Sequence, residues 1–325
     1  MKTFDEITAI VASELENINW GKEPVGLYAP IGYVLSMGGK RIRPALALMA
    51  CNLFSDDVQP ALNTALGLEI FHNFTLLHDD IMDRADVRRG KPTVHKKWDD
   101  NTAILSGDVM QIVAYQYIAK TPVGHLKPVL DLFSQTAAEI CEGQQYDVDF
   151  ERRDDVKAEE YLEMIRLKTA VLLACALKCG AIAGGAGEED ARLLYDFGIG
   201  IGLAFQLKDD LLDVYGNEAV FGKKIGGDIL CNKKTYLLIN ALDLAEGNDA
   251  EELRYWLGCT DENLSGEKIR AITSIYDRLG IRQICEDKML VFYTQAIAYL
   301  EKVGVSGNKK QGLRKLAENL MFRKE

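Results

Sequence analysis

Proline is distributed unevenly along the chain, and this limits the folds open to it. All seven prolines lie at or before Pro128, which leaves almost two hundred of the 325 residues without one. Apolar residues in that part recur at spacings of three and four, as on one face of a helix, and proline is largely excluded from helix interiors. We find no sustained alternation of apolar and polar residues bounded by turn signals. The sequence therefore predicts an all-α fold, a single large helical bundle.

The expected helices follow this periodicity. We place them at residues 3–17, 26–36, 43–54, 59–83, 99–120, 125–142, 157–183, 189–214, 234–245, 249–257, 265–300 and 308–323. Glycine, asparagine and basic residues mark loops at 19–24, 36–44, 84–93 and 216–233. None of these loops has the composition of a flexible linker, so we expect one domain over residues 1–325.

Two of the expected helical segments are dense in glycine and alanine. They are GAIAGGAG at 180–187 and GIGIGLA at 198–204. Each glycine inside a helix costs about 1 kcal/mol relative to alanine. Close helix packing, or a helix end at 184–187, would explain these glycines, and so would space for a ligand beside Asp209. The sequence favours neither explanation.

The composition argues against several classes of protein. A formal net charge of -11 argues against nucleic acid as the main partner, because phosphate backbones attract basic surfaces. The N-terminal stretch MKTFDEITAIVASELENI carries acids among its apolar residues and has no signal-peptide core. Lys178 interrupts the best candidate for the roughly 20 apolar residues that span a bilayer. We expect a cytoplasmic protein without a membrane span.

The seven cysteines give no sign of a metal site, because no two of them form a CxxC pair. Cys175 and Cys179 are one helical turn apart in an apolar run. We interpret them as buried thiols.

Two acidic clusters repeat the pattern D-D-x-x-D. The first ends the run LLHDDIMD at 76–83, and the second ends LKDDLLD at 207–213. On a helix, the first and last aspartates of each cluster lie about 6 Å apart along the axis on one face. The clusters comprise Asp79, Asp80 and Asp83, and Asp209, Asp210 and Asp213. A single copy would indicate a solvated helix end, but two copies, each ending an apolar helix, favour a metal site.

Mg²⁺ fits these clusters better than other common metal ions. Carboxylates this close raise one another's pKa unless a cation compensates them. Mg²⁺ takes oxygen ligands, keeps several waters and commonly joins one or two carboxylates to substrate phosphates. A calcium loop of the EF-hand type would alternate its ligands around a central glycine, and four histidines are too few for a histidine-rich zinc site.

Basic residues lie near both clusters in an otherwise acidic chain. GGKRIRP supplies Lys40, Arg41 and Arg43 beside two glycines, and Arg88 and Arg89 follow the first cluster by five residues. Four lysines lie before or after the second cluster in the sequence: Lys168, Lys223, Lys224 and Lys233. Singly, each would be a solvated surface residue. Together they predict a diphosphate held by Mg²⁺ on one side and by arginine and lysine on the other.

At these residues the sequence closely resembles the trans-isoprenyl diphosphate synthases, or polyprenyl synthetases. The matching segments are GGKRIRP (38–44), HNFTLLHDDIMD (72–83), RRGKPTVH (88–95), SGD (106–108), GQQYD (143–147), KTA (168–170), FQLKDDLLD (205–213) and GKKIGGDILCNKKT (222–235). They span about residues 25–240 in the family's order. The ordered set is far more specific than one acidic motif.

The resemblance implies an all-α prenyltransferase, a homodimer, with its active site in a deep central cavity. Asp79, Asp80 and Asp83 would bind Mg²⁺ and an allylic diphosphate, and Asp209, Asp210 and Asp213 would complete a site of about three Mg²⁺ ions. Arg88 would contact the allylic diphosphate, helped by Lys168 and Lys233. Lys40, Arg43, His72 and Arg89 would hold the diphosphate of isopentenyl diphosphate. Thr169 and Gln206 would line the reacting carbon, Gln144 and Asp147 would lie near the allylic tail and metals, and either Lys223 or Lys224 would contact diphosphate.

The resemblance also bears on product length. Phe74 and Thr75 lie about one helical turn before Asp79, and a bulky residue at such a position limits family members to short products. This implies farnesyl (C15) or geranylgeranyl (C20) diphosphate, and the single aromatic favours C20. Phe71, about one helical turn further from Asp79, would form a second barrier to the growing hydrocarbon chain. Packing in the core would equally explain a phenylalanine in a buried helix.

Three other functions are compatible with parts of the pattern. A class I terpene cyclase or squalene-synthase-like enzyme would share the fold but lack the isopentenyl diphosphate pocket. A non-catalytic regulatory subunit would have lost aspartates or arginines, and here both sets are complete. A metal-dependent phosphohydrolase would need a positioned water and a general base that the sequence does not reveal. Residues 241–325 show no motif with assignable chemistry.

Overall fold

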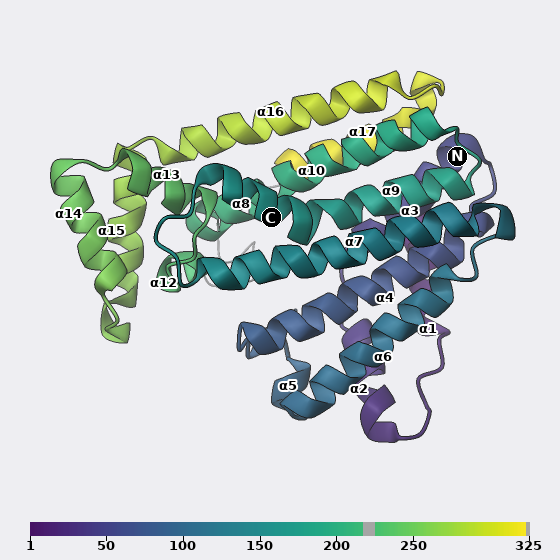
Figure 1. Cartoon of the computed structure of the whole chain (residues 1–325), viewed down its shortest axis with the longest axis horizontal. Coiled ribbons are helices and arrows are strands. Elements are labelled where there is room, and N and C mark those ends of the chain that lie inside the picture. Colours follow the sequence, from purple (N-terminus) through teal and green to yellow (C-terminus); the bar gives the residue numbers. More distant parts are fainter. Residues whose placement is uncertain (217–224, 323–325) are drawn as a thin grey trace. The chain divides into compact units, whose positions relative to one another are not determined.

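The computed structural model describes residues 1–216 and 225–322, and within them helices dominate (Figure 1). The longer helices of the N-terminal half are α1 (Phe4–Glu16), α2 (Val25–Ser36), α3 (Ile42–Phe54), α4 (Gln59–Met82), α6 (Asp100–Ile118) and α7 (Val123–Phe150). Those that follow are α8 (Ala158–Ile165), α9 (Val171–Ala183), α10 (Glu188–Tyr215), α13 (Tyr236–Leu244), α14 (Gly247–Gly258), α15 (Ser265–Arg278), α16 (Ile281–Lys302) and α17 (Gly307–Phe322). The expected all-α fold is confirmed.

Shorter elements interrupt or connect these helices. A π-helical turn, η1 (Arg166–Ala170), joins α8 to α9, and a 3₁₀ turn, η2 (Glu262–Leu264), precedes α15. The helices α5 (Val94–Lys97) and α12 (Gly227–Leu230) have four residues each. Within the described ranges, the strands are β1 (Val87–Arg88) and β2 (Lys91–Pro92), which pair as an antiparallel hairpin.

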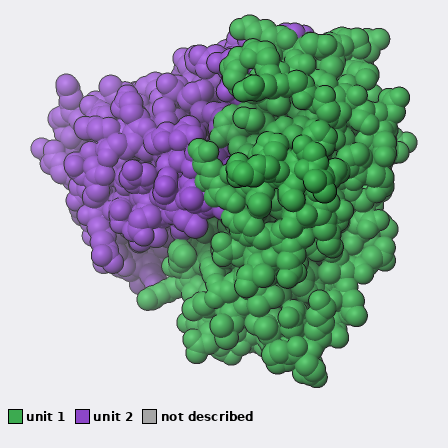
Figure 2. Space-filling view, turned by 45° about the vertical axis from the view of Figure 1, so that its right-hand side comes forward, with its two compact units in different colours: residues 1–135, 175–195, 302–313 green, residues 136–174, 196–301, 314–325 purple. Residues whose placement is uncertain are grey.

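The chain divides into two compact units (Figure 2). Unit 1 consists of residues 1–135, 175–195 and 302–313, and unit 2 of residues 136–174, 196–301 and 314–325. The expectation of one domain over residues 1–325 stays a prediction. None of the helices found in the described residues is long and apolar enough to cross a membrane.

Unit 1 is built around α4, which packs against α3 and α6. Fourteen residues of this helix are buried, from Ala61 to Asp80, so it is enclosed on several faces. Pro60 lies in its first turn, where a missing backbone N–H costs nothing. Local capping fixes other helix starts, as at α1, where Thr3 and Glu6 form a capping box. The first acidic cluster therefore ends a helix that is largely buried within unit 1.

Unit 2 has a core of its own, formed by α8, α10, α13, α15 and α16. Tyr161, Leu207, Leu237 and Ile275 are among its fully or nearly fully buried residues. The side-chain hydroxyl of Thr235 caps α13 by accepting the N–H of Leu238. The second acidic cluster lies on the C-terminal half of α10, next to core residues such as Leu207 and Leu211.

The glycine-rich segments are explained by close helix packing. A Cβ at Gly180 would lie 1.9 Å from the carbonyl oxygen of Ala47 in unit 1. A Cβ at Gly202 would lie 2.6 Å from both the Cα and the Cβ of Ala170 in unit 2. Real Cβ atoms do not tolerate such distances, so glycine is required for these backbones to approach. Cys175 and Cys179 are free buried thiols, as expected.

Several sequence-based boundaries were wrong. The segment 265–300, expected as one helix, is broken at Gly280, whose φ of 68° lies in the left-handed region. The helix expected at residues 125–142 was too short, because α7 continues to Phe150. The segment 157–183 contains the π-helical turn, and the loop 84–93 contains the hairpin.

Candidate active site

The first acidic cluster has one inward and two outward carboxylates. Asp80 is 4% exposed, whereas Asp79 is half-buried and Asp83 is exposed at the C-terminal cap of α4. Arg88 Nε donates to both carboxylate oxygens of Asp80 at 2.9 Å, and Arg88 Nη2 lies 2.7 Å from Oδ1. Arg88 therefore neutralises Asp80, and Asp79 and Asp83 are the more exposed carboxylates of the cluster.

A tight hairpin presents the two arginines that follow the cluster. Its turn residues, Arg89 and Gly90, have φ values of 53° and 73°, as a two-residue type I′ turn requires. Thr93 anchors the hairpin by donating from Oγ1 to the carbonyl of Ala85 at 2.7 Å. Arg88 and Arg89 therefore project from a rigid base next to the end of α4.

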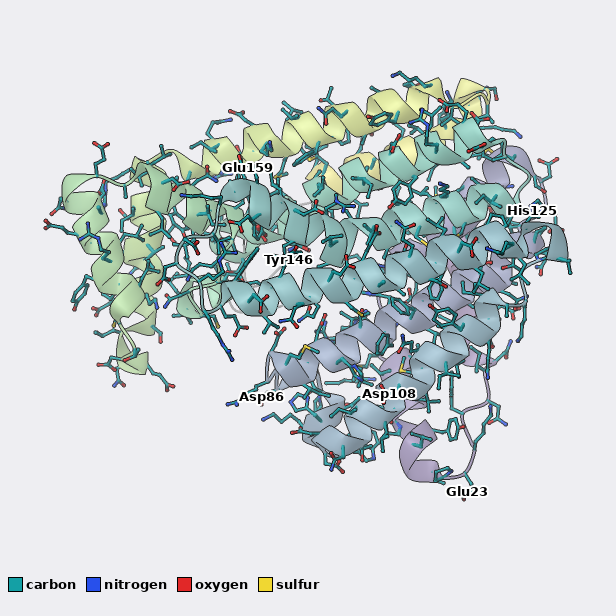
Figure 3. The ribbon with its side chains drawn as sticks, in the orientation of Figure 1. Glu23, Asp86, Asp108, His125, Tyr146 and Glu159 are labelled. Atoms are coloured by element: carbon teal, nitrogen blue, oxygen red, sulfur yellow. The ribbon has the colours of Figure 1, made fainter. Side chains whose placement is uncertain are left out.

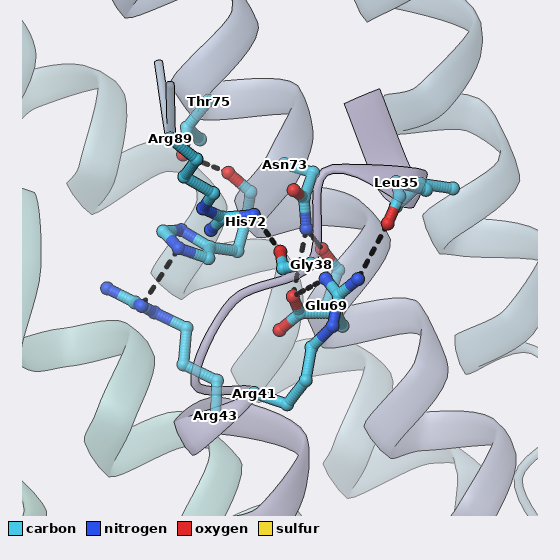
Figure 4. Close-up of polar contacts among 9 residues, drawn as sticks. All are labelled: Leu35, Gly38, Arg41, Arg43, Glu69, His72, Asn73, Thr75 and Arg89. Carbon is cyan, nitrogen blue, oxygen red and sulfur yellow. Dashed lines mark hydrogen bonds and ion pairs between the residues drawn. The ribbon is translucent and has the colours of Figure 1, made fainter. Parts of the chain in front are cut away.

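The segment 38–43, here called the basic loop, includes the first two residues of α3 and contacts the middle of α4 (Figure 4). Arg43 Nη1 lies 3.0 Å from His72 Nε2, and Arg89 Nη1 donates to the carbonyl of Gly38. A Cβ at Gly39 would lie 2.8 Å from the guanidinium carbon of Arg89, so only glycine fits there. Lys40 is exposed and lines a groove of about 670 Å³ beside α1. Arg43, His72 and Arg89 thus lie close to this segment, whereas Lys40 faces the groove beside α1.

His72 is neutral in this environment. Burial of the imidazole, reinforced by Arg43, Arg89, Arg88 and Arg41, lowers its pKa well below the usual 6.5. Because Arg43 donates to Nε2, the remaining ring proton belongs on Nδ1. The loop thus combines several guanidinium groups with an uncharged donor, a combination suited to a polyanion such as diphosphate.

In the second acidic cluster, as in the first, the middle aspartate is buried. Asp210 is 3% exposed, and its Oδ2 accepts the hydroxyl proton of Tyr161 at 2.5 Å. Gln206 Nε2 donates to Asp210 Oδ1 at 3.3 Å. Burial, reinforced by the nearby charge of Asp228, raises the pKa of Asp210 to about 7, although Tyr161 opposes the rise. Asp209 and Asp213 remain half-buried on the same helix.

Hydrogen bonds link this cluster to the π-helical turn and to the short helix α12. Thr169 Oγ1 donates to Gln206 Oε1 at 3.3 Å, which joins the two residues expected beside the reacting carbon. Asp213 Oδ2 accepts the backbone N–H of Asp228 at 3.0 Å. Unit 2 thereby places Thr169, Gln206 and Asp210 in one continuous network.

Asp147 holds the two lysines expected at the allylic diphosphate. Lys168 Nζ lies 2.6 Å and Lys233 Nζ 3.8 Å from its Oδ2. Burial alone would raise the pKa of Asp147, but Lys233 and Lys168 together lower it below its usual value. Lys168 belongs to the π-helical turn, and such turns are frequent at functional sites.

Other predicted positions are less central or lie elsewhere. Gln144 is half-buried on α7, and on the same helix Tyr146 is 46% exposed (Figure 3). Asp108, from the segment SGD, is exposed on α6 and is not part of either cluster (Figure 3). Lys223 and Lys224 lie outside the described residues.

The residues expected to set product length belong to an aromatic cluster in unit 1. Phe74 is 8% exposed and meets Phe71 edge-to-face at a centroid distance of 5.3 Å. Phe71 contacts Phe133 at 5.1 Å, and Phe133 contacts Tyr115 at 4.9 Å. Thr75, on the same helix, is half-buried, and its hydroxyl donates to the carbonyl of His72. Phe133 of α7 and Tyr115 of α6 were not predicted as part of this cluster.

Comparison with known proteins identifies the family. The family model described as Polyprenyl synthetase matches residues 24–276. The chain belongs to the polyprenyl synthetase family. It is therefore a trans-isoprenyl diphosphate synthase, a prenyltransferase, as the resemblance implied. The match covers both acidic clusters, the basic loop and the hairpin.

Individual relatives support the assignment along the whole polyprenyl synthetase chain. It is 46% identical to the geranylgeranyl diphosphate synthase of Methanosarcina mazei over 223 residues, 68% of each chain. It is 35% identical to the geranylfarnesyl diphosphate synthase of Natronomonas pharaonis over 99% of each chain.

Solved structures show the same fold. A crystal structure of a geranylgeranyl pyrophosphate synthase matches with a TM-score of 0.94, 44% identity and full coverage of both chains. That of the geranylgeranyl pyrophosphate synthase from Corynebacterium glutamicum, complexed with isoprenyl diphosphate and magnesium, matches with a TM-score of 0.84 and 29% identity. The latter match covers 98% of this chain and 97% of the other.

Proposed function

We propose that this polyprenyl synthetase condenses isopentenyl diphosphate head-to-tail with allylic diphosphates, namely dimethylallyl, geranyl and farnesyl diphosphate. The observation that carries the proposal is the cluster of Arg43, His72 and Arg89 in unit 1, which has other partners than the Asp80–Arg88 pair. Two separate arrangements of cationic groups suit two diphosphates. A cyclase, which uses one diphosphate, has no need for the second.

The allylic diphosphate is assigned to the acidic clusters and their cationic neighbours. Arg88 provides a guanidinium fork, while Lys168 and Lys233 provide point charges already gathered by Asp147. As the allylic C–O bond breaks, negative charge grows on the departing diphosphate. Preorganised cations stabilise that charge without a reorganisation cost at the moment of reaction.

The carboxylates fit Mg²⁺ in pairs. Among the described residues, no group of three or more His, Cys, Asp or Glu side chains could hold a metal ion alone. Mg²⁺ commonly takes one or two carboxylates and fills its other positions with water and substrate phosphates. Asp79 with Asp83 and Asp209 with Asp213 form such pairs, and we assign both to the same reaction. When bound, Mg²⁺ supplies Lewis-acid stabilisation of the leaving group; about three ions are expected from the family.

The second substrate is assigned to the basic loop. Lys40, Arg43, neutral His72 and Arg89 bind the diphosphate of isopentenyl diphosphate and orient its double bond toward the allylic carbocation. Thr169 and Gln206 line the reacting carbon, and Gln144 and Asp147 lie near the allylic tail. Loss of a proton from the adduct, taken up by the released pyrophosphate, restores an allylic product. No nucleophilic side chain is required.

We propose geranylgeranyl diphosphate (C20) as the main product, with farnesyl diphosphate (C15) as the shorter alternative. Support comes from Phe74, a bulky side chain one turn before Asp79, and from the names of several relatives. Phe71 lies behind Phe74 as a second obstacle. Because some relatives are geranylfarnesyl diphosphate synthases, a product assay should also look for geranylfarnesyl diphosphate, the next longer product.

We propose that the chain forms a homodimer. The apolar side chains of Leu105 and Ile112 on α6 are 57% and 58% exposed, on a helix that otherwise packs into unit 1. Full burial of an exposed side chain of this size is worth about 1.5–3 kcal/mol, so burying the exposed part of these two against a second copy would contribute roughly half of that each. Light scattering on purified protein tests this, and a monomer at micromolar concentration would contradict it. A cytoplasmic location is likewise proposed, to be tested by cell fractionation.

The stoichiometry of pyrophosphate release distinguishes the activities. The purified protein is incubated with Mg²⁺ and dimethylallyl diphosphate, with and without isopentenyl diphosphate. A synthase releases one pyrophosphate for each isopentenyl diphosphate consumed, and little without it. Pyrophosphate release that is independent of isopentenyl diphosphate would instead indicate a cyclase, and release of inorganic phosphate would indicate a phosphohydrolase.

A further inference from the structure

Two side chains beneath the basic loop have no role in the assignments above. Arg41 and Glu69 form an ion pair, with Arg41 Nη1 2.5 Å from Glu69 Oε1 (Figure 4). The other guanidinium nitrogen, Nη2, donates to the carbonyl of Leu35 at 2.7 Å. The two side chains are only 10% and 3% exposed. Arg41 therefore points into the protein, unlike Lys40 beside it, which is exposed.

The carboxylate of Glu69 is held in one orientation from its own helix. Asn73, one turn further along α4, donates from Nδ2 to Glu69 Oε1 at 3.0 Å and to the Glu69 carbonyl at 2.8 Å. Asn73 is fully buried. His72 lies three residues after Glu69 and therefore near the same face of the helix. Glu69 is thus a fixed acceptor next to the predicted isopentenyl diphosphate residues.

The backbone of Arg41 makes its ion pair structurally important. Arg41 has a φ of 48° and a ψ of 37°, a left-handed conformation that residues other than glycine rarely adopt. It stands immediately before α3, so its conformation sets the direction in which the loop enters that helix. Gly38 and Gly39 also have positive φ values. The loop therefore depends on tertiary contacts for its shape. The buried Arg41–Glu69 ion pair is one of these contacts.

The loop meets α4 at two points one helical turn apart. Arg41 contacts Glu69, and Arg43 contacts His72. The two pairs differ in net charge. The carboxylate of Glu69 neutralises Arg41, whereas the neutral imidazole of His72 does not cancel the charge of Arg43. Burial lowers the pKa of Arg89, as do Arg41 and Arg88, whereas Glu69 and Asp80 oppose that shift. Glu69 thereby acts on Arg89 as well as on Arg41.

We propose that Arg41 and Glu69 are positioning residues for the diphosphate of isopentenyl diphosphate: the pair holds the loop so that Lys40, Arg43 and Arg89 converge, without contacting the substrate. The inference rests on the proposed function of that loop. Loss of Glu69 leaves a buried guanidinium without its counter-charge, which is costly, so Arg41 must leave its place and carry the loop with it. Loss of either partner therefore affects one substrate and not the other.

The test measures KM for each substrate in Glu69→Gln, Arg41→Gln and the double variant. We expect KM for isopentenyl diphosphate to rise about tenfold in each, which corresponds to 1.4 kcal/mol, with KM for the allylic substrate changed less than twofold. The double variant should resemble the single ones, because partners that act as a unit are not additive. Unchanged KM values, or an equal rise for both substrates, would overturn the proposal.

Thr64→Val serves as a matched control on the same helix. Thr64 is fully buried, and its hydroxyl shares a 2.8 Å hydrogen bond with that of Thr121. Thr121 is far in sequence from the basic loop. This variant should lower Tm without raising either KM. If Glu69→Gln fails to fold, the double variant, which removes both buried charges together, and Asn73→Ala, which removes only the support of Glu69, replace it. Both should still raise KM for isopentenyl diphosphate.

A binding measurement separates failure of this inference from failure of the proposed function. Calorimetry gives Kd for isopentenyl diphosphate without Mg²⁺ or an allylic substrate, so no turnover is needed. Weaker binding by Arg41→Gln than by the unaltered protein supports the positioning role even if no elongation occurs. Equal binding refutes it, even in a protein that elongates normally.

Discussion

The carboxylate of Asp80 lies against the guanidinium of Arg88, with Arg88 Nη2 2.7 Å from Asp80 Oδ1 and the carboxylate only 5% exposed. Asp210 is turned inward in the same way, toward Tyr161. In each D-D-x-x-D cluster the middle carboxylate is thus the most deeply buried one. The first and last aspartates of each cluster are the more accessible ones.

Asp79→Asn should therefore be more damaging to metal-dependent turnover than Asp80→Asn. Loss of a carboxylate that positions the cation at the leaving group should lower kcat by about 100-fold or more. Asp80→Asn should act mainly through Arg88 and have a smaller effect on the Mg²⁺ concentration for half-maximal rate. Steady-state rates over a Mg²⁺ titration check this, and an equal shift in both variants would contradict it.

His72 should give the stability of the protein a pH dependence. Its pKa is lowered in the folded protein, so between that value and about 6.5 only the unfolded chain binds the proton. Stability must then rise with pH up to about 6.5, and this contribution is lost on acidification. The slope of Tm against pH between about 5 and 6.5 should be shallower in His72→Gln. Parallel slopes for the two proteins would show that His72 is not buried in its neutral form.

Asp210 should act in the opposite sense. Its pKa is raised to about 7 from 3.8, so in this range the folded state binds the proton more tightly than the unfolded state does. Stability falls as pH rises through this interval. Between pH 6 and 8 the unaltered protein should lose about 1 kcal/mol relative to Asp210→Asn. Denaturant unfolding in a chelator at both pH values measures the difference, and no relative change would contradict the raised pKa.

Phe74→Ala should lengthen the product. Removal of the ring opens the path next to the first cluster, but Phe71, Phe133 and Tyr115 remain packed behind it. We therefore expect one further addition at first, and longer chains only when Phe71 is also replaced. Mass spectrometry of the products checks this. Phe197→Ala, a fully buried phenylalanine of α10, is the control: it should cost about 3–5 kcal/mol of stability and leave product length unchanged.

The sequence predicted those features that depend on local pattern. Apolar periodicity located most helices to within a few residues, including α4 and α10. The charged motifs contain both partners of the Asp80–Arg88 and Asp147–Lys168 contacts. The break at Gly280 was missed because a single glycine in a helical pattern is often tolerated. The hairpin was missed because its strands have two residues each.

The features that could not be predicted depend on tertiary contacts. Nothing in the run LLHDDIMD distinguishes Asp80 from Asp79, because the difference arises from Arg88 on the hairpin. Tyr161 is 49 residues from Asp210, and no local spacing relates the two. Glu69 did give a weak signal, since an acid inside the apolar run LEIFHNF must find a partner when buried. Its partner, Arg41, could be named only from the structure.

The central claim is that this chain joins isopentenyl diphosphate to an allylic diphosphate. The most direct measurement is mass spectrometry of the products formed from isopentenyl diphosphate and dimethylallyl diphosphate by the purified protein with Mg²⁺. The account predicts diphosphates that grow in five-carbon steps and accumulate at C20, with C15 as the shorter alternative, and no product without Mg²⁺. Folded protein that forms no carbon–carbon bond with dimethylallyl, geranyl or farnesyl diphosphate would contradict it.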